Sequence, residues 1–211
     1  MLSEHTNVLS IGRELWRQPP RDTPIVAMRV EDALALSAGV VRVRNHPSLR
    51  SAWTQHLTSG RLIRALPGVL LDADLAADPV AWMRAVHLWD PDAVIAGAAA
   101  AYLTFDPGTI PKNVLVYTRT KLAHRGLVRF QRHRLAPDLT MWRGEVHVTS
   151  PAVTALTAAI AGDYATATTA LREGIVSQDR LQEAARRLRL SPRDPLVRVL
   201  RELSENPWSV A

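Results

Sequence analysis

Apolar residues recur at helical spacing through the first part of the chain and then change to short runs typical of strands. Three segments there place apolar side chains on one helix face. The third begins with a proline at its first helical position, which favours a helix start, and its apolar stripe is Leu49, Trp53 and Leu57. The predicted helices are Thr6–Trp16, Val30–Ser37 and Asn45-His46-Pro47 to about Thr58.

A β-hairpin is predicted directly after the third helix. Two short apolar runs, Arg61–Ala65 and Val69–Leu71, flank Pro67-Gly68, and Pro-Gly between such runs is a turn signal. Three helices followed by a two-stranded hairpin is the element order of a winged helix-turn-helix. We therefore expect a DNA-binding domain over residues 1–74.

The rest of the chain predicts helices, then a small sheet, then helices again. An acidic, alanine-rich stretch from Asp72 to Pro79 is the expected linker, and residues 79–211 are the expected second domain, so the fold class is α+β. Ser150-Pro151 and the residues Asp163, Ser177 and Ser191 are expected to cap its later helices. Helices are predicted from Pro79 to about Asp90 and through Gly97–Leu103, and strands over Asn113–Thr118, Leu127–His133 and Glu145–Thr149.

Composition narrows the class of protein. The 211 residues are 47% hydrophobic, which is ample for a buried core, and they contain no cysteine, which excludes a disulfide scaffold or a thiolate metal site. No apolar run approaches the roughly 18 residues of a membrane span, and the N-terminus lacks a basic region followed by an apolar one. We expect a soluble, cytoplasmic protein that does not insert into membranes.

The net charge of +6 is unevenly distributed. Residues 1–66 carry nine basic and five acidic side chains, residues 67–111 carry one and six, and residues 112–150 carry eight and two. Two basic blocks therefore flank an acidic one, and the first coincides with the predicted winged helix.

The third helix would be the recognition helix. Arginine and glutamine off its apolar stripe fit guanine and adenine edges, and arginines before the helix and on the first hairpin strand would hold phosphates. The alternative is that these are ordinary solvated charges. The candidate DNA-binding residues are Arg42, Arg44, Ser48, Arg50, Ser51, Thr54, Gln55, Arg61 and Arg64.

The second basic block has two interpretations. In the first, it is a binding surface that adds phosphate contacts or binds an acidic partner. In the second, it is a solvated strand and loop, as runs of charge usually are. On the predicted strand Leu127–His133, alternation places Arg129 outward, opposite Val128 and Phe130. The candidate residues of this surface are Arg119, Lys121, Arg125, Arg129, Arg132 and Arg134.

Enzymatic motifs are missing from the sequence. It contains no G-x-S-x-G, P-loop or G-x-G-x-x-G pattern, and its seven histidines have no metal-ligand spacing. The close acids Asp72, Asp74 and Asp78 are better explained by linker solvation than by metal binding. We expect no catalytic set, no metal site and no cofactor.

Three motifs, in order, resemble those of one family. The run WTQHLTSGRLIRALPGVLL (Trp53–Leu71) is similar to the third helix and wing of AbiEi-type antitoxins of type IV toxin–antitoxin systems. PDAVIAGAAAAYL (Pro91–Leu103) resembles a helix pair of that family, and VHVTSPAVTALTAAI (Val146–Ile160) resembles a later segment. The resemblance extends from about Val30 to Leu188. The chain departs from it at Leu70, where an aromatic residue is usual, at the uncharged wing tip Leu66-Pro67, and in a longer stretch from Val40 to Ser48.

Membership of that family would imply a winged-helix domain followed by an α+β antitoxin domain. Such proteins repress their own operon and counter a nucleotidyltransferase-like toxin without a tight complex. The expected partners are therefore double-stranded DNA, as the chain's own operator, and such a toxin.

Two alternatives remain open. The basic second domain would be an interaction module that neutralises a partner directly. Alternatively, the chain would be the regulatory front half of a restriction-endonuclease-like protein, because Leu203–Trp208 resembles the lead-in to such a domain.

Overall fold

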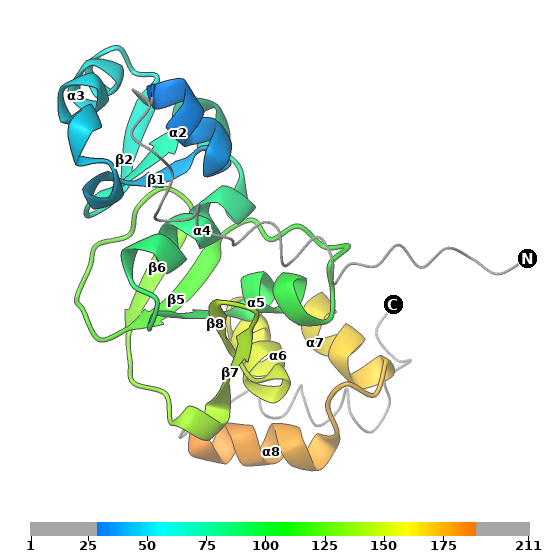
Figure 1. Cartoon of the computed structure of the whole chain (residues 1–211). Helices are drawn as coiled ribbons and strands as arrows, with labels where there is room; N and C mark the ends of the chain where they lie inside the picture. Colours follow the sequence, from blue (N-terminus) through cyan, green and yellow to red (C-terminus); the bar gives the residue numbers. More distant parts are fainter. Residues whose placement is uncertain (1–28, 189–211) are drawn as a thin grey trace, which may run out of the picture.

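The computed structural model describes residues 29–188 (Figure 1). The predicted helix Thr6–Trp16 and the predicted cap Ser191 lie outside this range. The described chain contains α-helices and two β-sheets, so the α+β class is confirmed.

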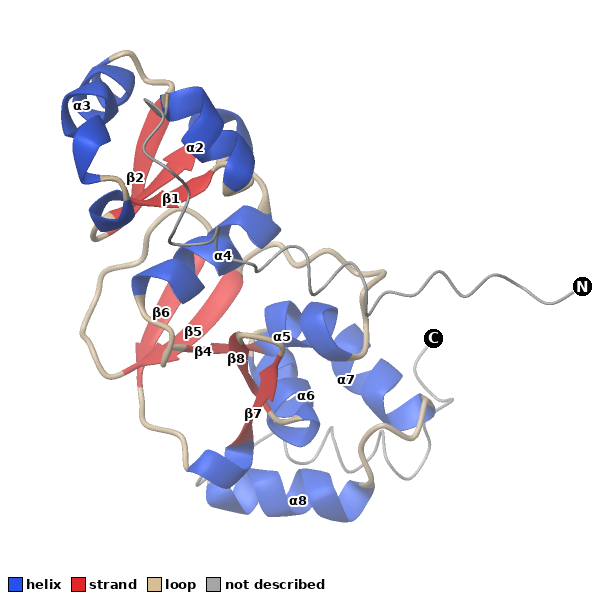
Figure 2. Ribbon diagram, in the orientation of Figure 1, coloured by secondary structure: helices blue, strands red, loops and turns tan. Residues whose placement is uncertain are grey.

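The first part of the structure, residues 29–75, is called here the N-terminal unit. Its three strands form an antiparallel sheet in the order β1-β3-β2, with the helices α2 and α3 on one side (Figure 2). Its elements are α2 Val30–Leu36, β1 Val40–Arg42, the short 3-10 turns η1 Val43–Asn45 and η2 Pro47–Leu49, α3 Arg50–Thr58, β2 Leu62–Leu66, β3 Val69–Asp72 and the 3-10 turn η3 Ala73–Leu75.

The predicted hairpin is confirmed. Strands β2 and β3 pair antiparallel around Pro67-Gly68, where Gly68 adopts a φ of 73° that suits glycine. The register shifts between Arg64 and Leu66, which marks a bulge next to the turn.

Two details of the N-terminal unit differ from the prediction. The predicted third helix begins later, because Pro47–Leu49 forms a 3-10 turn and α3 starts at Arg50. In addition, Val40–Arg42 is a strand that pairs with β3. Because helices cover both faces of the sheet, both valines of β1 are buried, and polar residues do not alternate with apolar ones along the strand. The sequence therefore carries no strand pattern there.

The second part, residues 79–188, is called here the C-terminal unit. Its five strands are ordered β6-β5-β4-β8-β7. Strand β4 pairs antiparallel with β5 and parallel with β8, β5 pairs parallel with β6, and β7 pairs antiparallel with β8. Its elements are α4 Pro79–Trp89, β4 Val94–Ala96, α5 Gly97–Thr104, β5 Val114–Thr118, β6 Val128–Arg132, the 3-10 turn η4 Pro137–Leu139, β7 Thr140–Arg143, β8 Val146–Thr149, α6 Pro151–Ile160, α7 Tyr164–Arg172 and α8 Gln178–Arg187.

The predicted three-strand sheet is too small, because two strands were not expected. Strand β4 is the centre of the sheet, but its three residues are fully buried and run directly into the alanine-rich helix α5, so no period-2 pattern precedes the helical one. Strand β7 lies at the edge and carries Met141 and Trp142 in a sequence with few β-branched residues. The other three predicted strands are confirmed as β5, β6 and β8.

Helix starts agree with the cap residues read from the sequence. The Asp163 side chain accepts a hydrogen bond from Thr166 N at 3.2 Å, and Ser177 Oγ accepts one from Arg180 N at 3.4 Å. Helix α6 begins at Pro151 as expected, although the hydroxyl of Ser150 makes no capping bond.

The acidic stretch Asp72–Pro79 is not a free linker. Asp72 accepts a hydrogen bond from Asp74 N at 3.1 Å and Asp78 accepts one from Val80 N at 2.9 Å, so these carboxylates close the turn η3 and cap α4. From the sequence alone, the solvation of a linker is the expected explanation for these acids. In the structure, Asp72 and Asp78 instead accept hydrogen bonds that cap the next turn and helix.

One hydrophobic core joins the two units. Val40, Val69 and Leu71 on one face of the N-terminal sheet pack with buried α4 side chains such as Met83, and α4 packs in turn on the five-stranded sheet. The other face of the N-terminal sheet packs on α2 and α3. Helices α6, α7 and α8 form a second core with one another. Helix α4 is therefore buried between the two sheets. This position explains why apolar residues lie on all sides of the helix and not along one stripe.

Gly126 offers a test of packing next to α4. It has a φ of 50°, and a Cβ there would overlap the indole of Trp82, whose Nε1 donates to Ala76 O at 2.9 Å. We expect Gly126→Ala to lower the free energy of unfolding by about 2–4 kcal/mol, from backbone strain plus the steric clash. Denaturant unfolding measures it.

Gly144→Ala is the matched control. Gly144 also has a positive φ, of 61°, but no atom lies near its Cβ position. It should lose only the backbone contribution, about 1–2 kcal/mol. Equal losses in the two variants would contradict the contact between Gly126 and Trp82.

Candidate nucleic-acid interface

Helix α3 turns one polar face to solvent. The predicted stripe is confirmed, since Leu49 and Trp53 are buried and Leu57 is half-buried. Four of the residues predicted to bind DNA share the exposed side and come from consecutive turns, namely Arg50, Ser51, Thr54 and Gln55.

The side chains of this face are of the types that can form hydrogen bonds with base edges. Arg50 and Gln55 make no side-chain hydrogen bond or ion pair with another residue of the described part, so their donors and acceptors face solvent. Thr54 Oγ1 donates to Arg50 O at 3.2 Å, which orients its hydroxyl along the helix. A helix with a free guanidinium and a free amide on its exposed side can bind purine edges in a major groove.

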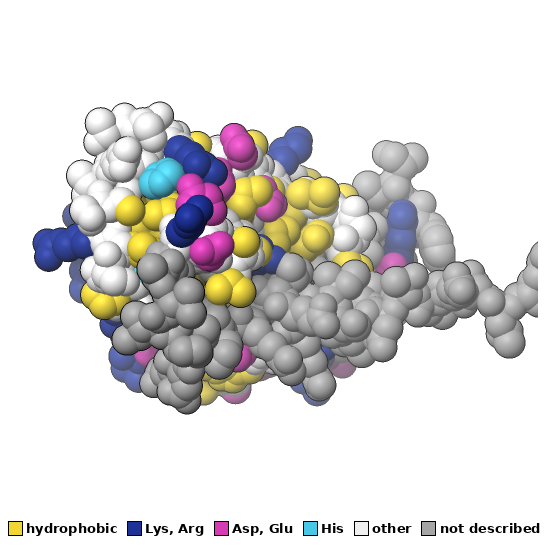
Figure 3. All heavy atoms as spheres, turned by 45° about the horizontal axis from the view of Figure 1, so that its top comes forward, with side chains coloured by type: hydrophobic (Ala, Val, Ile, Leu, Met, Phe, Trp, Pro, Cys, Tyr) yellow, Lys and Arg dark blue, Asp and Glu magenta, His cyan; other side chains and the backbone are white. Residues whose placement is uncertain are grey.

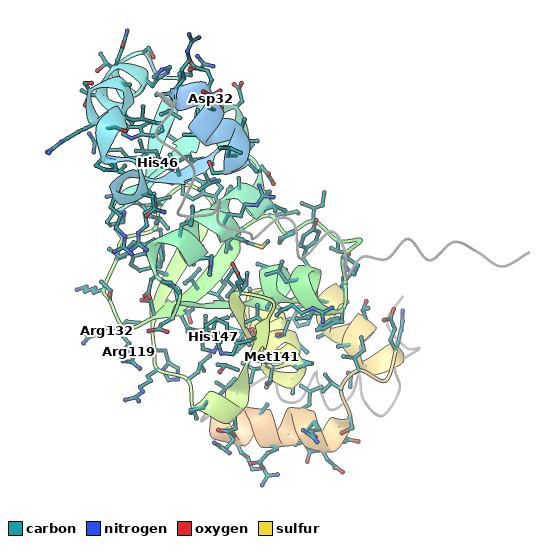
Figure 4. All side chains as sticks on the ribbon, in the orientation of Figure 1. Asp32, His46, Arg119, Arg132, Met141 and His147 are labelled. Carbon is teal, nitrogen blue, oxygen red and sulfur yellow. The ribbon has the colours of Figure 1, made fainter. Side chains whose placement is uncertain are left out.

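The start of α3 is held by an aromatic contact. The ring of His46 packs edge-on against Trp53, with centroids 6.2 Å apart, and burial lowers the pKa of His46. Burial thus favours the neutral form of the ring. His46, labelled in Figure 4, ties the turn that leads into α3 to the helix itself. Arg44 and Ser48, two residues before and after it, are exposed.

Arg42 does not share the exposure of Arg44. Its guanidinium donates to the carbonyl of Trp89, at the C-terminal end of α4, at 3.4 Å. Burial and the neighbouring charge of Arg44 lower the pKa of Arg42, and Asp90 opposes that effect. Arg42 therefore links the two units and is less available to DNA than its position in the sequence suggested.

The two arginines of the hairpin differ as well. Arg61 pairs with Glu31 of α2 at 3.2 Å, and His56 Nε2 lies 3.9 Å from the same carboxylate oxygen. Arg64 is exposed and has no ion-pair partner among the described residues. Figure 3 views this end of the molecule and shows acidic side chains among the basic ones. Of the hairpin arginines, Arg64 is therefore the one free to contact a phosphate.

Sequence reasoning missed the role of Glu31. Its place in the first turn of a helix indicated only a favourable interaction with the helix dipole. Its partner Arg61 lies 30 residues away, so no local spacing could have revealed the pair.

The second basic block separates into two groups. Arg119 and Arg132 lie at the same end of the sheet, because Arg119 follows Thr118, which is opposite Arg132 in the parallel register of β5 and β6 (Figure 4). Arg125 and Arg129 lie at the start of β6, where Arg125 forms a bridge with Val128 and Arg129 donates to Gly126 O at 2.8 Å. All the candidate residues of this block are exposed, including Lys121 and Arg134, and Arg129 points outward as predicted.

A chain of contacts connects the two basic blocks. Arg42 reaches Trp89 O, and the next residue, Asp90, accepts a hydrogen bond from Thr118 Oγ1 at 3.5 Å. Arg119 follows immediately. The end of β1 and the ends of β5 and β6 therefore lie near one another through the C-terminal end of α4, although 76 residues separate the end of β1 from that of β5 and 90 separate it from that of β6.

Residues 29–188 contain no group of three acidic or histidine side chains placed as metal ligands would be. No helix in the same range has the length and apolar character needed to cross a membrane. Comparison with known proteins finds no family model that matches the chain and no curated protein that matches its sequence.

Proposed function

We propose that the chain is a sequence-specific DNA-binding protein that represses its own operon as the antitoxin of a type IV toxin–antitoxin system. The observation that carries this proposal is the exposed face of α3, where Arg50, Ser51, Thr54 and Gln55 lie together and where the side chains of Arg50 and Gln55 have no partner in the described structure. In the proposed complex this face enters the major groove.

The arrangement around α3 supports a winged-helix interpretation. The order α2, β1, α3, β2, β3, with β1 next to β3, is typical of winged-helix domains. In that interpretation the 3-10 turns η1 and η2 take the place of the middle helix, and the hairpin is the wing. Residues 1–74 would then be the DNA-binding domain and residues 79–211 the antitoxin domain.

The remaining basic residues fit supporting roles. Arg44 and Arg64 would hold phosphates on either side of the recognition helix. Arg119 and Arg132 would add contacts further along the duplex, because the link through Asp90 brings their end of the sheet towards the N-terminal unit. We further propose a cytoplasmic location and a nucleotidyltransferase-like toxin as the protein that this chain counters, without a tight complex.

The central test is binding of the full chain to duplexes from its own promoter. Fluorescence anisotropy at moderate salt should show a higher affinity for the promoter than for a random duplex of equal length. Equal affinity for both would overturn the proposal.

Arg64→Ala is predicted to weaken binding to all sequences to a similar degree. A phosphate contact carries no base information, so the ratio of specific to random affinity should stay constant while the salt slope falls by about one unit. A salt series on both duplexes measures this. Arg180→Ala, an exposed arginine on α8, is the control and should change neither quantity.

A second candidate function is direct neutralisation of a partner by the C-terminal unit. The exposed basic group at the ends of β5 and β6 favours it, because these side chains are available to an acidic protein. Protection that survives a combined Arg50→Ala and Gln55→Ala change, together with co-purification of the toxin, would favour this function over DNA binding.

A further inference from the structure

Strand β7 ends the five-stranded sheet and has no strand on its outer side in the described structure (Figures 1 and 2). Ser150 N donates to Leu139 O at 2.9 Å, which makes residues 139 and 150 a hydrogen-bonded pair. Such pairs alternate along an antiparallel ladder, so Met141 and Arg143 bond to β8. The backbone N–H and C=O groups of Thr140 and Trp142 therefore point away from the sheet.

The side chains at this edge form an ordered aromatic surface. Trp142 stacks on His147 of β8, with ring centroids 4.5 Å apart and planes 7° from parallel. His147 Nε2 lies 2.9 Å from Thr140 Oγ1, which fixes the imidazole beneath the indole. Trp142 is nevertheless 54% exposed. The hairpin thus holds a large apolar side chain in one orientation beside backbone groups that have no partner within residues 29–188.

The opposite edge of the same sheet is covered. At β6, the loop before the strand folds back, so that Val128 bonds to Arg125 and Phe130 N donates to His124 Nδ1 at 3.2 Å. The exposed charges of Arg129 and Arg132 further disfavour pairing there. Proteins protect sheet edges in this way against association. Among residues 29–188, therefore, one edge of the sheet is protected and the other is not.

We propose that β7 pairs antiparallel with β7 of a second copy of this chain. In this dimer a two-fold axis passes next to Met141. The outward-pointing backbone N–H and C=O groups of Thr140 then face those of Trp142 in the second copy, and each of these residues donates one hydrogen bond and accepts one. The two indoles then lie on the same face as diagonal neighbours, at a separation that aromatic side chains can bridge. One five-stranded sheet would continue into the next.

Charge favours a second copy as the occupant. Asp138 lies before β7 and Arg143 at its end, so antiparallel pairing brings Arg143 of one copy towards Asp138 of the other. Asp138 already pairs with Arg187 at 2.9 Å in its own chain, so in the proposed dimer this carboxylate would lie between Arg187 and Arg143 of the second copy. The inference does not rest on the proposed function.

Site-specific crosslinking tests the register, because the chain contains no cysteine. Met141→Cys would place two cysteines directly opposite each other across the axis, within the Cα separation that a disulfide requires. Mild oxidation should convert most of this variant to a covalent dimer. Arg143→Cys lies on the same strand and face, but its two copies would be about 13 Å apart. It should remain monomeric on a denaturing gel, as should Leu36→Cys.

Sedimentation equilibrium of the unoxidised full chain provides the second measurement. We expect a monomer–dimer equilibrium that Trp142→Lys weakens at least tenfold, because it replaces the central aromatic contact by like charges. Ile110→Lys, at a residue 68% exposed elsewhere, should leave it unchanged. A chain that is monomeric throughout the micromolar range would overturn the proposal. A dimer that withstands Trp142→Lys and gives no Met141→Cys crosslink would overturn it too.

Discussion

Replacing Arg50 with alanine is expected to relax base preference at one position of the operator by about 1–3 kcal/mol. Arg50 opens α3, is exposed, and has no side-chain partner in the described structure, so its guanidinium can form paired hydrogen bonds with a guanine edge. Competition between the promoter duplex and single-base variants measures the effect. Affinity for the original sequence should fall, while affinity for the variant at the contacted position should change little.

The controls separate base reading from charge. Arg64→Ala removes the same charge from the hairpin and should weaken all duplexes alike, and Arg180→Ala removes it from a distant helix. If Arg50→Ala weakened every duplex to the same degree, Arg50 would be a phosphate contact and the proposed orientation of α3 would be wrong.

Leu71→Ala is expected to lower the free energy of unfolding by about 2–5 kcal/mol, the usual cost of truncating a fully buried leucine. Leu71 lies on β3 and is 0% exposed. It belongs to the core shared by the N-terminal sheet, α4 and the five-stranded sheet. Because that core joins the two units, we expect a single unfolding transition that moves as a whole in this variant.

Denaturant unfolding followed by tryptophan fluorescence and circular dichroism measures both expectations. Leu36→Ala, at a residue 56% exposed, is the matched control and should change stability by less than about 0.5 kcal/mol. Two separate transitions, with only one of them shifted by Leu71→Ala, would show that the units fold independently and would contradict the shared core.

Local patterns in the sequence are sufficient to predict the helices and turns whose own residues favour them. Helices such as α3, α4 and α6 have an apolar stripe or a proline at the first position, and the β2–β3 hairpin has Pro67-Gly68. The exposed face of α3 follows from the same periodicity, because a residue four positions from Trp53 lies on the buried side and its neighbours do not. The exposure of the four α3 residues predicted to bind DNA could therefore be predicted without a structure.

Buried strands lacked such signals. Val40–Arg42 and Val94–Ala96 have side chains covered on both faces, so polar residues do not alternate with apolar ones, and three residues are too few to show a period. Whether such a run becomes a strand depends on the neighbours that supply its hydrogen bonds. Those neighbours, Val69–Leu71 for β1 and Leu115–Tyr117 for β4, are remote in the chain.

The sequence showed that basic and acidic residues fall into separate blocks. It did not show which of the basic side chains are free to contact a ligand and which are held by other residues. Nothing in the sequence distinguishes Arg42, Arg61 and Arg64 from one another. In the structure Arg42 donates to a carbonyl of α4 and Arg61 pairs with Glu31. Arg64 is exposed. Helix and turn formation is governed by residues within one or two turns, so the amino-acid order alone specified α3, its polar face and the hairpin. Ion pairs, the core shared through α4 and the place of β7 at the end of its sheet depend on residues brought together from distant positions, and for those the folded chain was required.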